Sequence, residues 1–227
     1  YWFNLAHWLR KQGIEVVLVN PVVTHRNKEN RDNSPSKNDA KDALTIADAV
    51  SRGFYTEFTP QAGQLEQLKT LMSDREFWVK YAISLGNRIV RWIDMYFPEF
   101  QLVFKDWKAE RSLASLRAFP LPCELQDLNA DEVIQRWHEQ GMRRPGGVTG
   151  KAKAVQLIQA AKRSIGRTEG LEQARRDLQR LLTAYDQITS HLQEMKEEVE
   201  ALLGKIPMAK QLQSIPGMGP TTIAALL

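Results

Sequence analysis

The chain has little cysteine and no long apolar run. A single cysteine, Cys123, in 227 residues excludes an intramolecular disulfide framework and is typical of a reducing cytosol. Its neighbours Leu121 and Leu125 predict that the thiol is a buried small hydrophobic group and not a nucleophile. No stretch reaches the length of a membrane-spanning helix and no signal peptide is recognisable, so we expect a cytoplasmic location.

Histidine is also scarce, and the charge of the chain is not strongly one-sided. The four histidines are scattered, and no spacing typical of a zinc site occurs. With 31 Lys and Arg against 27 Asp and Glu, the net charge of +4 favours a polyanionic partner without requiring one. A length of 227 residues allows one or two domains.

The N-terminal part predicts a helix followed by a strand. Residues 2–12 have apolar side chains at helical spacing, and Gly13 is a stop signal. Residues 14–19 form a nearly continuous apolar run, which is typical of a strand buried on both faces in an α/β sheet. The buried face of the predicted helix consists of Trp2, Leu5, Ala6 and Leu9.

A polar segment and a second helix follow. Residues 24–38 are polar, mixed in charge and interrupted by Pro35, which predicts a mobile loop that orders when metal or nucleic acid binds. Residues 39–52 predict a helix. Its apolar positions, expected to face inward beside two acids, are Ala43, Ile46, Ala47 and Val50.

These two acids, Asp39 and Asp42, are the strongest candidates for chemistry. Three residues apart on a helix, their carboxylates share one face. A hard divalent cation relieves the repulsion between neighbouring carboxylates, and such a metal activates the attacking oxygen and neutralises the leaving one in phosphoryl transfer. The simpler interpretation is an exposed acidic pair that forms ordinary surface ion pairs with Lys37 and Lys41.

The order of these segments resembles the catalytic domain of the DEDD-type insertion-sequence transposases. The resemblance is carried by Tyr1-Trp2 before an amphipathic helix, by Val16-Val17-Leu18-Val19-Asn20-Pro21, by Lys37-Asn38-Asp39-Ala40-Lys41-Asp42-Ala43 and by Ile46-Ala47. It implies a ribonuclease-H-like fold in which four acids bind Mg²⁺, with Asp39 and Asp42 as the last two. It also implies a recombinase whose target is chosen with a structured bridge RNA.

The resemblance further implies that parts of the site lie outside this chain. The first two acids are expected upstream of Tyr1, and the nucleophilic serine is expected in a C-terminal domain beyond Leu227. We therefore expect the chain to be the middle of an enzyme and to be inactive alone. Lys37 and Lys41 would contact phosphates near the cleaved bond.

Two long helices are predicted in the remainder of the chain. Residues 61–97 repeat large apolar side chains every seven residues, and residues 169–203 alternate steps of three and four, the heptad pattern of a coiled coil. The repeat of the first helix is Leu71, Trp78, Leu85 and Trp92. The apolar positions of the second are Leu171, Ala174, Leu178, Leu181, Tyr185, Ile188, Leu192, Met195, Val199 and Leu202.

These helices can pair in more than one way. They can form an antiparallel hairpin within one chain or pair with a second protomer, and a monomeric helical bundle has similar apolar seams. The resemblance implies self-association, because the long helices of the family form a coiled coil used in assembling dimers and tetramers around the nucleic acids.

The segment between the long helices, residues 98–168, predicts a helical insert. Asn129, followed by two acids, has the pattern of a helix start. The second half of the insert has the most one-sided charge of the chain, which predicts contacts with phosphates; a solvated helix face is the alternative. Its cations are Arg143, Arg144, Lys151, Lys153, Lys162, Arg163 and Arg167.

A glycine-rich turn near the C-terminus predicts a second nucleic-acid contact. Ile215-Pro216-Gly217-Met218-Gly219-Pro220 resembles a helix-hairpin-helix, and also the segment that opens the C-terminal domain of the same family. Glycines allow close approach to a phosphate, and the following helix start presents free N–H donors. Ordinary tight turns have similar glycines. The candidate contacts are Gly217, Gly219 and Thr221.

Together these predictions describe a mainly α protein. Residues 1–58 are expected to be the C-terminal part of a partial α/β ribonuclease-H-like domain. Residues 59–205 are expected to form a helical and coiled-coil domain with the insert at 98–168, and residues 206–227 to begin a C-terminal transposase domain.

The predicted function is that of a DNA transposase or recombinase that moves an insertion sequence, with Mg²⁺ as cofactor and DNA, structured bridge RNA and further copies of itself as partners. Three alternatives stay open. They are a non-enzymatic nucleic-acid-binding module that oligomerises through a coiled coil, a pure coiled-coil interaction protein, and a resolvase-like metal-dependent nuclease.

Overall fold

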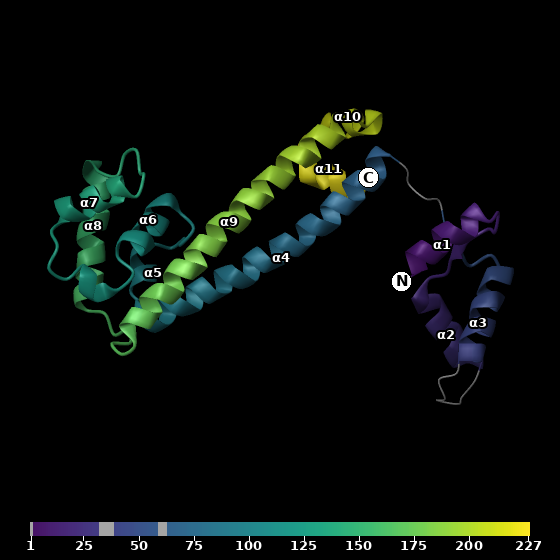
Figure 1. The fold of residues 1–227 in the computed structure, drawn as a ribbon, viewed down its shortest axis with the longest axis horizontal. Coiled ribbons are helices and arrows are strands. Elements are labelled where there is room, and N and C mark those ends of the chain that lie inside the picture. Colours follow the sequence, from purple (N-terminus) through teal and green to yellow (C-terminus); the bar gives the residue numbers. More distant parts are fainter. Residues whose placement is uncertain (1, 32–38, 59–62) are drawn as a thin grey trace. The chain divides into compact units, whose positions relative to one another are not determined.

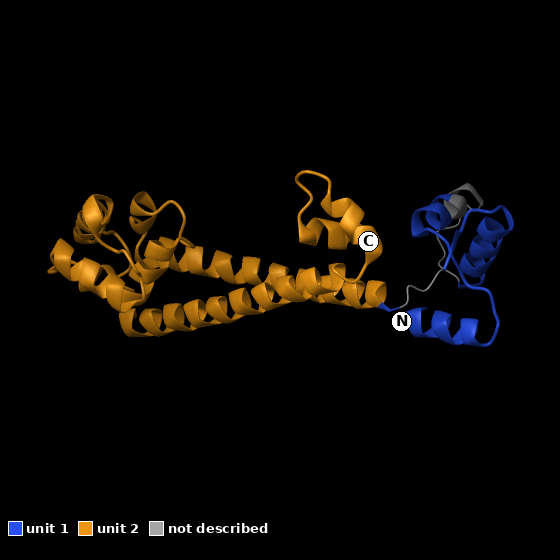
Figure 2. Ribbon diagram, turned by 90° about the horizontal axis from the view of Figure 1, so that it is seen from above, with its two compact units in different colours: residues 1–63 blue, residues 64–227 orange. Residues whose placement is uncertain are grey.

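The chain folds into two compact units, unit 1 (Tyr1–Gly63) and unit 2 (Gln64–Leu227), shown in Figure 2. The structure, a computed structural model, describes residues 2–31, 39–58 and 63–227. It is mainly helical (Figure 1), which confirms the predicted class. None of the helices in these ranges is long and apolar enough to cross a membrane.

Unit 1 combines short helices with a minimal sheet. In chain order its elements are α1 (Trp2–Lys11), β1 (Val17–Leu18), α2 (Pro21–Arg31), α3 (Asp39–Ser51) and β2 (Thr56–Glu57). The two strands pair antiparallel, and α2 packs against α3. The ribonuclease-H-like fold stays a prediction, because the described part of unit 1 contains only this short ladder.

The strand is shorter and more exposed than the apolar run at 14–19 predicts. Only Val17 and Leu18 pair with β2, and the side chains of Ile14 and Leu18 are 49% and 36% exposed. The expectation of a strand buried on both faces is wrong for the described residues. An apolar run shows which side chains favour burial, but a ladder of two short strands cannot cover them.

The predicted buried face of α1 is wrong at two of its four positions. Ala6 is buried and Leu9 is half-buried, but Trp2 and Leu5 are 52% and 57% exposed. The ring of Trp2 makes an edge contact with the buried ring of Phe58, at 5.5 Å between centroids. The small ladder next to α1 therefore covers only a narrow stripe of the helix.

A helix replaces part of the loop predicted at residues 24–38. Helix α2 begins at Pro21, where proline costs no backbone hydrogen bond, and the Val22 N–H donates to Asn20 Oδ1 at 2.9 Å. This start signal overrides the polar composition, so the loop prediction is wrong where α2 forms. Residues 32–38 lie outside the described ranges.

Helix α3 forms as predicted, but its inward stripe is different. Its buried positions are Thr45 and Ala49. Thr45 can be buried because its hydroxyl donates to the Lys41 carbonyl at 2.8 Å, within the same helix. Of the predicted stripe, Val50 is half-buried. The other three members are exposed: Ala43, Ile46 and Ala47.

Unit 2 is built on two 33-residue helices, α4 (Gln64–Tyr96) and α9 (Leu171–Leu203). They lie side by side and run in opposite directions (Figure 1). Neighbouring residues along the pair are Trp92 with Ala174, Trp78 with His191, and Leu68 with Leu203. Of the arrangements left open by the sequence, the structure has the antiparallel hairpin within one chain.

An apolar seam joins the two long helices. Every predicted heptad position of α9 is buried or half-buried, and so is the seven-residue repeat of α4. Trp92 is 1% exposed, and its indole N–H donates to the Ala174 carbonyl at 2.9 Å. The seam therefore buries the large side chain of Trp92 and provides a hydrogen-bond acceptor for its polar atom.

The insert between the long helices is itself helical. Its elements are α5 (Phe100–Val103), α6 (Glu110–Ala118), the 3₁₀ turn η1 (Pro122–Glu124), α7 (Ala130–Glu139) and α8 (Gly147–Lys162). Its fully buried Trp137 and Leu157 belong to the same apolar cluster as Trp92 and Leu178 of the hairpin. The core of the insert thus continues the seam.

Helix α7 begins where the sequence predicts. The Asn129 side chain accepts the N–H groups of Asp131 and Glu132, both at 3.0 Å. The Glu132 carboxylate in turn accepts the Asn129 N–H at 2.7 Å, which completes a capping box.

The buried position predicted for Cys123 is wrong. The residue lies in η1 and is exposed. Its neighbours Leu121 and Leu125 are 1% and 0% exposed. The tight turn directs both leucines inward, so the residue between them faces water.

A buried carboxylate attaches the loop between α8 and α9 (residues 163–170) to the end of α4. Glu99 is 9% exposed, and it accepts the Ser164 hydroxyl at 2.6 Å and the Ile165 N–H at 2.9 Å. Next to these bonds, a Cβ atom on Gly166 would lie 2.1 Å from the Tyr96 carbonyl oxygen. Only glycine allows this close approach of two backbones.

Replacing Leu178 with alanine should reduce the free energy of unfolding by about 2–5 kcal/mol, because the side chain is fully buried in the seam. Urea unfolding followed by circular dichroism measures the loss. Leu102→Ala is the matched control, since Leu102 is 72% exposed and its loss should cost less than about 0.5 kcal/mol. Equal losses in both variants would show that the seam is not the stabilising core.

Acid should destabilise unit 2 through Glu99. Burial raises the pKa of Glu99, but the hydrogen bonds from Ser164 and Ile165 and the charge of Arg163 outweigh it, and the pKa lies below the ordinary 4.5. Because the folded-state pKa is the lower one, the carboxylate stabilises the fold above the unfolded-state pKa. This contribution is lost as the pH falls through the folded-state value.

Glu99→Gln should therefore unfold at a lower temperature near neutral pH and show a flatter fall in melting temperature from about pH 5 to about pH 3. Glu172→Gln, at an exposed glutamate of α9, should keep the slope of the unsubstituted protein. Parallel pH curves for Glu99→Gln and the unsubstituted protein would contradict the assignment.

Candidate functional site

The first turn of α3 carries both candidate metal ligands. Asp39 is the first residue of the helix and is exposed, and Asp42 is half-buried. Their spacing places both carboxylates on one face of the helix, and negative charge at a helix start also stabilises the helix itself. Lys41 is half-buried next to Asp42. Lys37, the other predicted phosphate contact of this region, lies outside the described residues.

The two acids alone do not form a complete metal site. In the part of the chain that the structure describes, no group of three or more His, Cys, Asp or Glu side chains could hold a metal. Mg²⁺, however, usually keeps several waters and is bound by one or two carboxylates together with phosphate oxygens. Asp39 and Asp42 match the number of carboxylates in such a partial site.

Other acids of unit 1 have cationic neighbours. Asp48, two turns further along α3, forms an ion pair with Arg52 at 3.1 Å. Glu15 and Glu57 line a cavity of about 330 Å³ together with Arg10. A guanidinium in that cavity compensates the two carboxylates and disfavours a divalent cation there.

The basic part of the insert presents most, but not all, of its cations to water. The Lys153 ammonium donates to the Val103 carbonyl at 2.6 Å and lies 5.9 Å from the centre of the Phe104 ring. Lys151 is exposed but forms an ion pair with Asp131 at 3.2 Å. The other predicted phosphate contacts are exposed; these are Arg143, Arg144, Lys162, Arg163 and Arg167.

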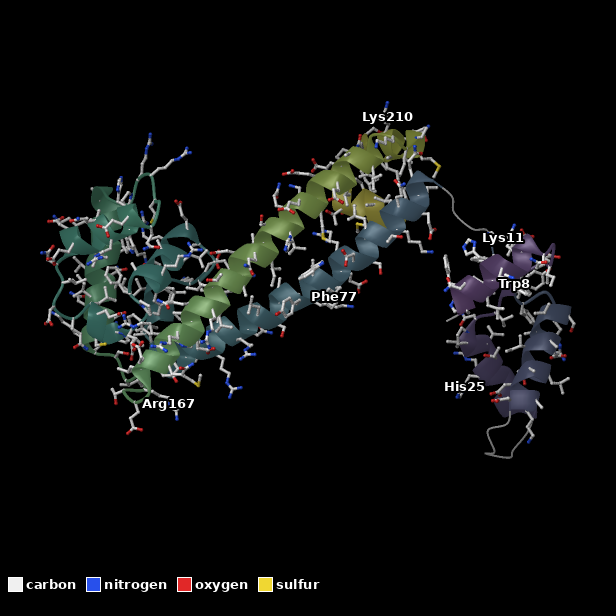
Figure 3. All side chains as sticks on the ribbon, in the orientation of Figure 1. Trp8, Lys11, His25, Phe77, Arg167 and Lys210 are labelled. Carbon is white, nitrogen blue, oxygen red and sulfur yellow. The ribbon has the colours of Figure 1, made fainter. Side chains whose placement is uncertain are left out.

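The exposed cations lie at the two ends of α8. Arg143 and Arg144 precede the helix, and Arg163 and Arg167 follow it, with Arg167 labelled in Figure 3. The sequence has no Asp or Glu in residues 140–168. A helix of 16 residues is about 24 Å long, so α8 separates two cationic ends by a distance comparable to the diameter of a DNA duplex.

The predicted hairpin near the C-terminus consists of two seven-residue helices, α10 (Pro207–Gln213) and α11 (Pro220–Leu226). In the turn between them Gly217 is exposed and has a φ of 86°, a left-handed conformation that favours glycine. Gly219 precedes α11 as its N-cap, and Thr221 is half-buried. Binding of nucleic acid by this turn stays a prediction.

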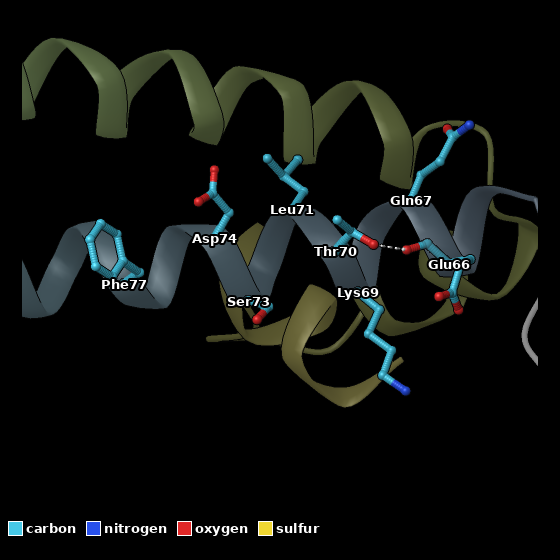
Figure 4. Close-up of a pocket in the computed structure, with 8 residues that line it drawn as sticks. All are labelled: Glu66, Gln67, Lys69, Thr70, Leu71, Ser73, Asp74 and Phe77. Atoms are coloured by element: carbon cyan, nitrogen blue, oxygen red, sulfur yellow. Dashed lines mark hydrogen bonds between the residues drawn. The ribbon is translucent and has the colours of Figure 1, made fainter. Parts of the chain in front are cut away.

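A broad surface hollow lies along α4, and its eight lining residues all belong to that helix (Figure 4). Its volume is about 900 Å³. Asp74 and Leu71 point toward one side of the helix in Figure 4, and Ser73 and Lys69 toward the other. The side chains do not converge on one point, so the hollow does not form a chemical site.

Sequence reasoning missed two groups that the structure places near the basic insert. Arg88 and Arg91 are exposed on the last turns of α4, and Glu99 anchors the loop between α8 and α9. The two arginines fall outside the apolar stripe of α4, and from this position in the sequence their exposure could have been predicted. Glu99 carried no signal, because its partner Ser164 is 65 residues away.

Comparison with known proteins finds a similarity in the N-terminal part of the chain. A family model for the DEDD transposases of the IS110 type, described as Transposase, matches residues 1–98. The matched region includes Asp39 and Asp42 and ends just after α4. No curated protein and no solved structure matches the chain. The resemblance to the DEDD-type insertion-sequence transposases is therefore confirmed for residues 1–98.

Proposed function

We propose that the chain is part of a DNA transposase that moves an insertion sequence, with Asp39 and Asp42 as ligands of Mg²⁺. The observation that carries this proposal is the family match over residues 1–98, which includes both acids. Their placement in one turn of α3 supports it, because two neighbouring carboxylates suit a hydrated divalent cation. A transposase acts on DNA, so DNA is the expected partner.

In this proposal the metal and the side chains of the protein have different roles in cleavage. Bound Mg²⁺ would neutralise charge on the phosphate oxygens at the cleaved bond and activate the attacking oxygen. Asp39, which is exposed, can reach a metal on a bound nucleic acid, and Asp42 is held more firmly because it is half-buried. Lys41, and Lys37 by its position in the sequence, would contact the adjacent phosphates.

The remaining parts would support nucleic acids and assembly. Residues 1–58 would contribute to a ribonuclease-H-like catalytic domain, residues 59–205 would contact DNA and a structured bridge RNA, and residues 206–227 would begin a DNA-binding C-terminal domain. The exposed cations at both ends of α8 support the nucleic-acid contacts. The bridge RNA, the self-association through the long helices and the distant serine come from the resemblance alone.

A second candidate function is a nucleic-acid-binding module without catalysis. It is favoured by one observation, the absence of Asp and Glu from residues 140–168, which suits phosphate binding whether or not a metal is held. A resolvase-like nuclease would instead need the acids of α3 but not the serine. Substitution of the acids separates the module from both enzymes.

Asp42→Ala should reduce transposition in cells by more than about 100-fold, because even groups that only orient a metal ligand cost 10–100-fold when removed. A second readout is Mn²⁺ titration followed by NMR, in which broadening of the amides near Asp39 should disappear in the variant. Asp48→Ala, on the same helix, removes a surface ion pair with Arg52 and should leave both readouts nearly unchanged. Unimpaired transposition by Asp42→Ala would leave the binding module as the better function.

The double variant Arg143→Ala/Arg144→Ala should lower the slope of log K against log salt for duplex DNA by about 2, because each phosphate contact contributes about 1. Fluorescence anisotropy across a salt series measures the slope. Arg136→Ala is the control, since this exposed arginine lies on α7 and pairs with Glu139 at 3.5 Å. An unchanged slope in the double variant would remove both arginines from the interface.

A further inference from the structure

We infer that the loop between α8 and α9 is a wedge for duplex DNA, in which Ile165 enters between base pairs while Arg163 and Arg167 bind phosphates on either side. The inference rests on the proposed function, from which it takes DNA as the partner. It adds a contact with the bases, whereas the cations alone bind only the backbone.

The backbone at Ile165 is fixed by hydrogen bonds, while its side chain projects into water. Its side chain is 86% exposed. A single exposed apolar side chain is common and needs no explanation by itself. Here, however, the Ile165 N–H and the Ser164 hydroxyl donate to the Glu99 carboxylate at 2.9 and 2.6 Å, and the Arg167 N–H donates to the Met95 carbonyl at 2.9 Å.

The loop also lies directly on α4. The Gly166 N–H donates to the Ser164 hydroxyl oxygen at 3.3 Å, and Gly166 approaches the Tyr96 carbonyl too closely for any side chain. Surface loops are normally mobile, so these contacts are more than the connection of two helices requires. A projecting side chain on a fixed backbone loses little conformational entropy when it inserts into a partner.

Positive charge surrounds the projecting side chain. Arg163 and Arg167 are exposed on either side of Ile165. Arg91, also exposed, lies one helical turn before Met95, whose carbonyl is bonded to the Arg167 N–H. The fold therefore adds an arginine of α4 to the two arginines of the loop.

Three acids lie near the loop and offset part of this charge. Glu99 interacts electrostatically with Arg163, but its carboxylate is directed into the loop backbone and the residue is only 9% exposed. Asp94 of α4 accepts the Gln101 side-chain N–H at 2.6 Å. Glu169 is exposed at the far end of the loop, further along the chain from Ile165 than either Arg163 or Arg167.

An apolar side chain between arginines suits duplex DNA better than other partners. Proteins that kink DNA insert Ile, Leu, Met or Phe between base pairs in the minor groove and place arginines beside them. Single-stranded RNA is bound mainly by stacking on aromatic rings, and the loop has none. Protein interfaces are usually centred on buried Trp, Tyr or Arg and not on a lone aliphatic tip.

The test uses the full chain and a short DNA duplex with 2-aminopurine at a flexible TA step, whose fluorescence rises when the base is unstacked. The unsubstituted protein should raise the fluorescence. Ile165→Ala should abolish the rise and weaken binding about tenfold, with an unchanged salt slope. Ile165→Leu should keep the rise, because it keeps an apolar side chain of the same volume.

Arg163→Ala and Arg167→Ala should each lower the salt slope by about 1. The matched control is Leu102→Ala, which removes another highly exposed aliphatic side chain and should change neither readout. Binding and fluorescence that are the same in Ile165→Ala and the unsubstituted protein would overturn the wedge and leave the proposed function standing. An effect of Ile165→Ala on structured RNA alone would also overturn it, and no binding of the unsubstituted protein to duplex DNA would count against both proposals.

Discussion

The packing of α4 against α9 is the interaction on which the rest of unit 2 depends. Each helix alone exposes a long apolar face, and helices are stabilised in water chiefly by burying such a face against a partner. At one end of the pair the seam runs into the core of the insert through Trp92 and Leu178. At the other end, α11 buries Ile223 and Ala224 against Leu68 and Leu203. The position of every candidate contact in unit 2 therefore follows from this one seam.

Glu99 shows how a buried charge can organise such a scaffold. Removing a carboxylate from water is costly, and the cost is offset only when hydrogen bonds replace the lost water. The loop supplies these bonds from Ser164 and Ile165, and it also supplies the charge of Arg163. Hydrogen bonds to the Glu99 carboxylate therefore hold the loop backbone in place. The arginines of the loop and the side chain of Ile165 are exposed on its outer side.

Prediction from the sequence succeeded where the signal was local. The heptad pattern of α9 and the Asn129 start of α7 depend on residues three or four positions apart, and the structure has both elements within two residues of the expected bounds. The close spacing of Asp39 and Asp42 on one turn is predictable for the same reason. Prediction failed where burial depends on distant partners. Trp2 and Leu5 are exposed, although they belong to the apolar face of α1. An apolar helix face in the sequence does not indicate whether another element of the fold will cover it. Lys153 points inward because of Val103, which is 50 residues away.

The insert also determines how the two long helices meet. Trp92 and Ala174, which are joined by a hydrogen bond, are 82 residues apart along the chain. Closing a loop of that length costs conformational entropy before any contact of the seam forms, so the hairpin has unusually long-range topology for a helical unit. The bonds of Glu99 hold the end of α4 next to the loop that leads into α9. Once the insert has folded, the two helices start side by side, and the seam can close from that end as a local process.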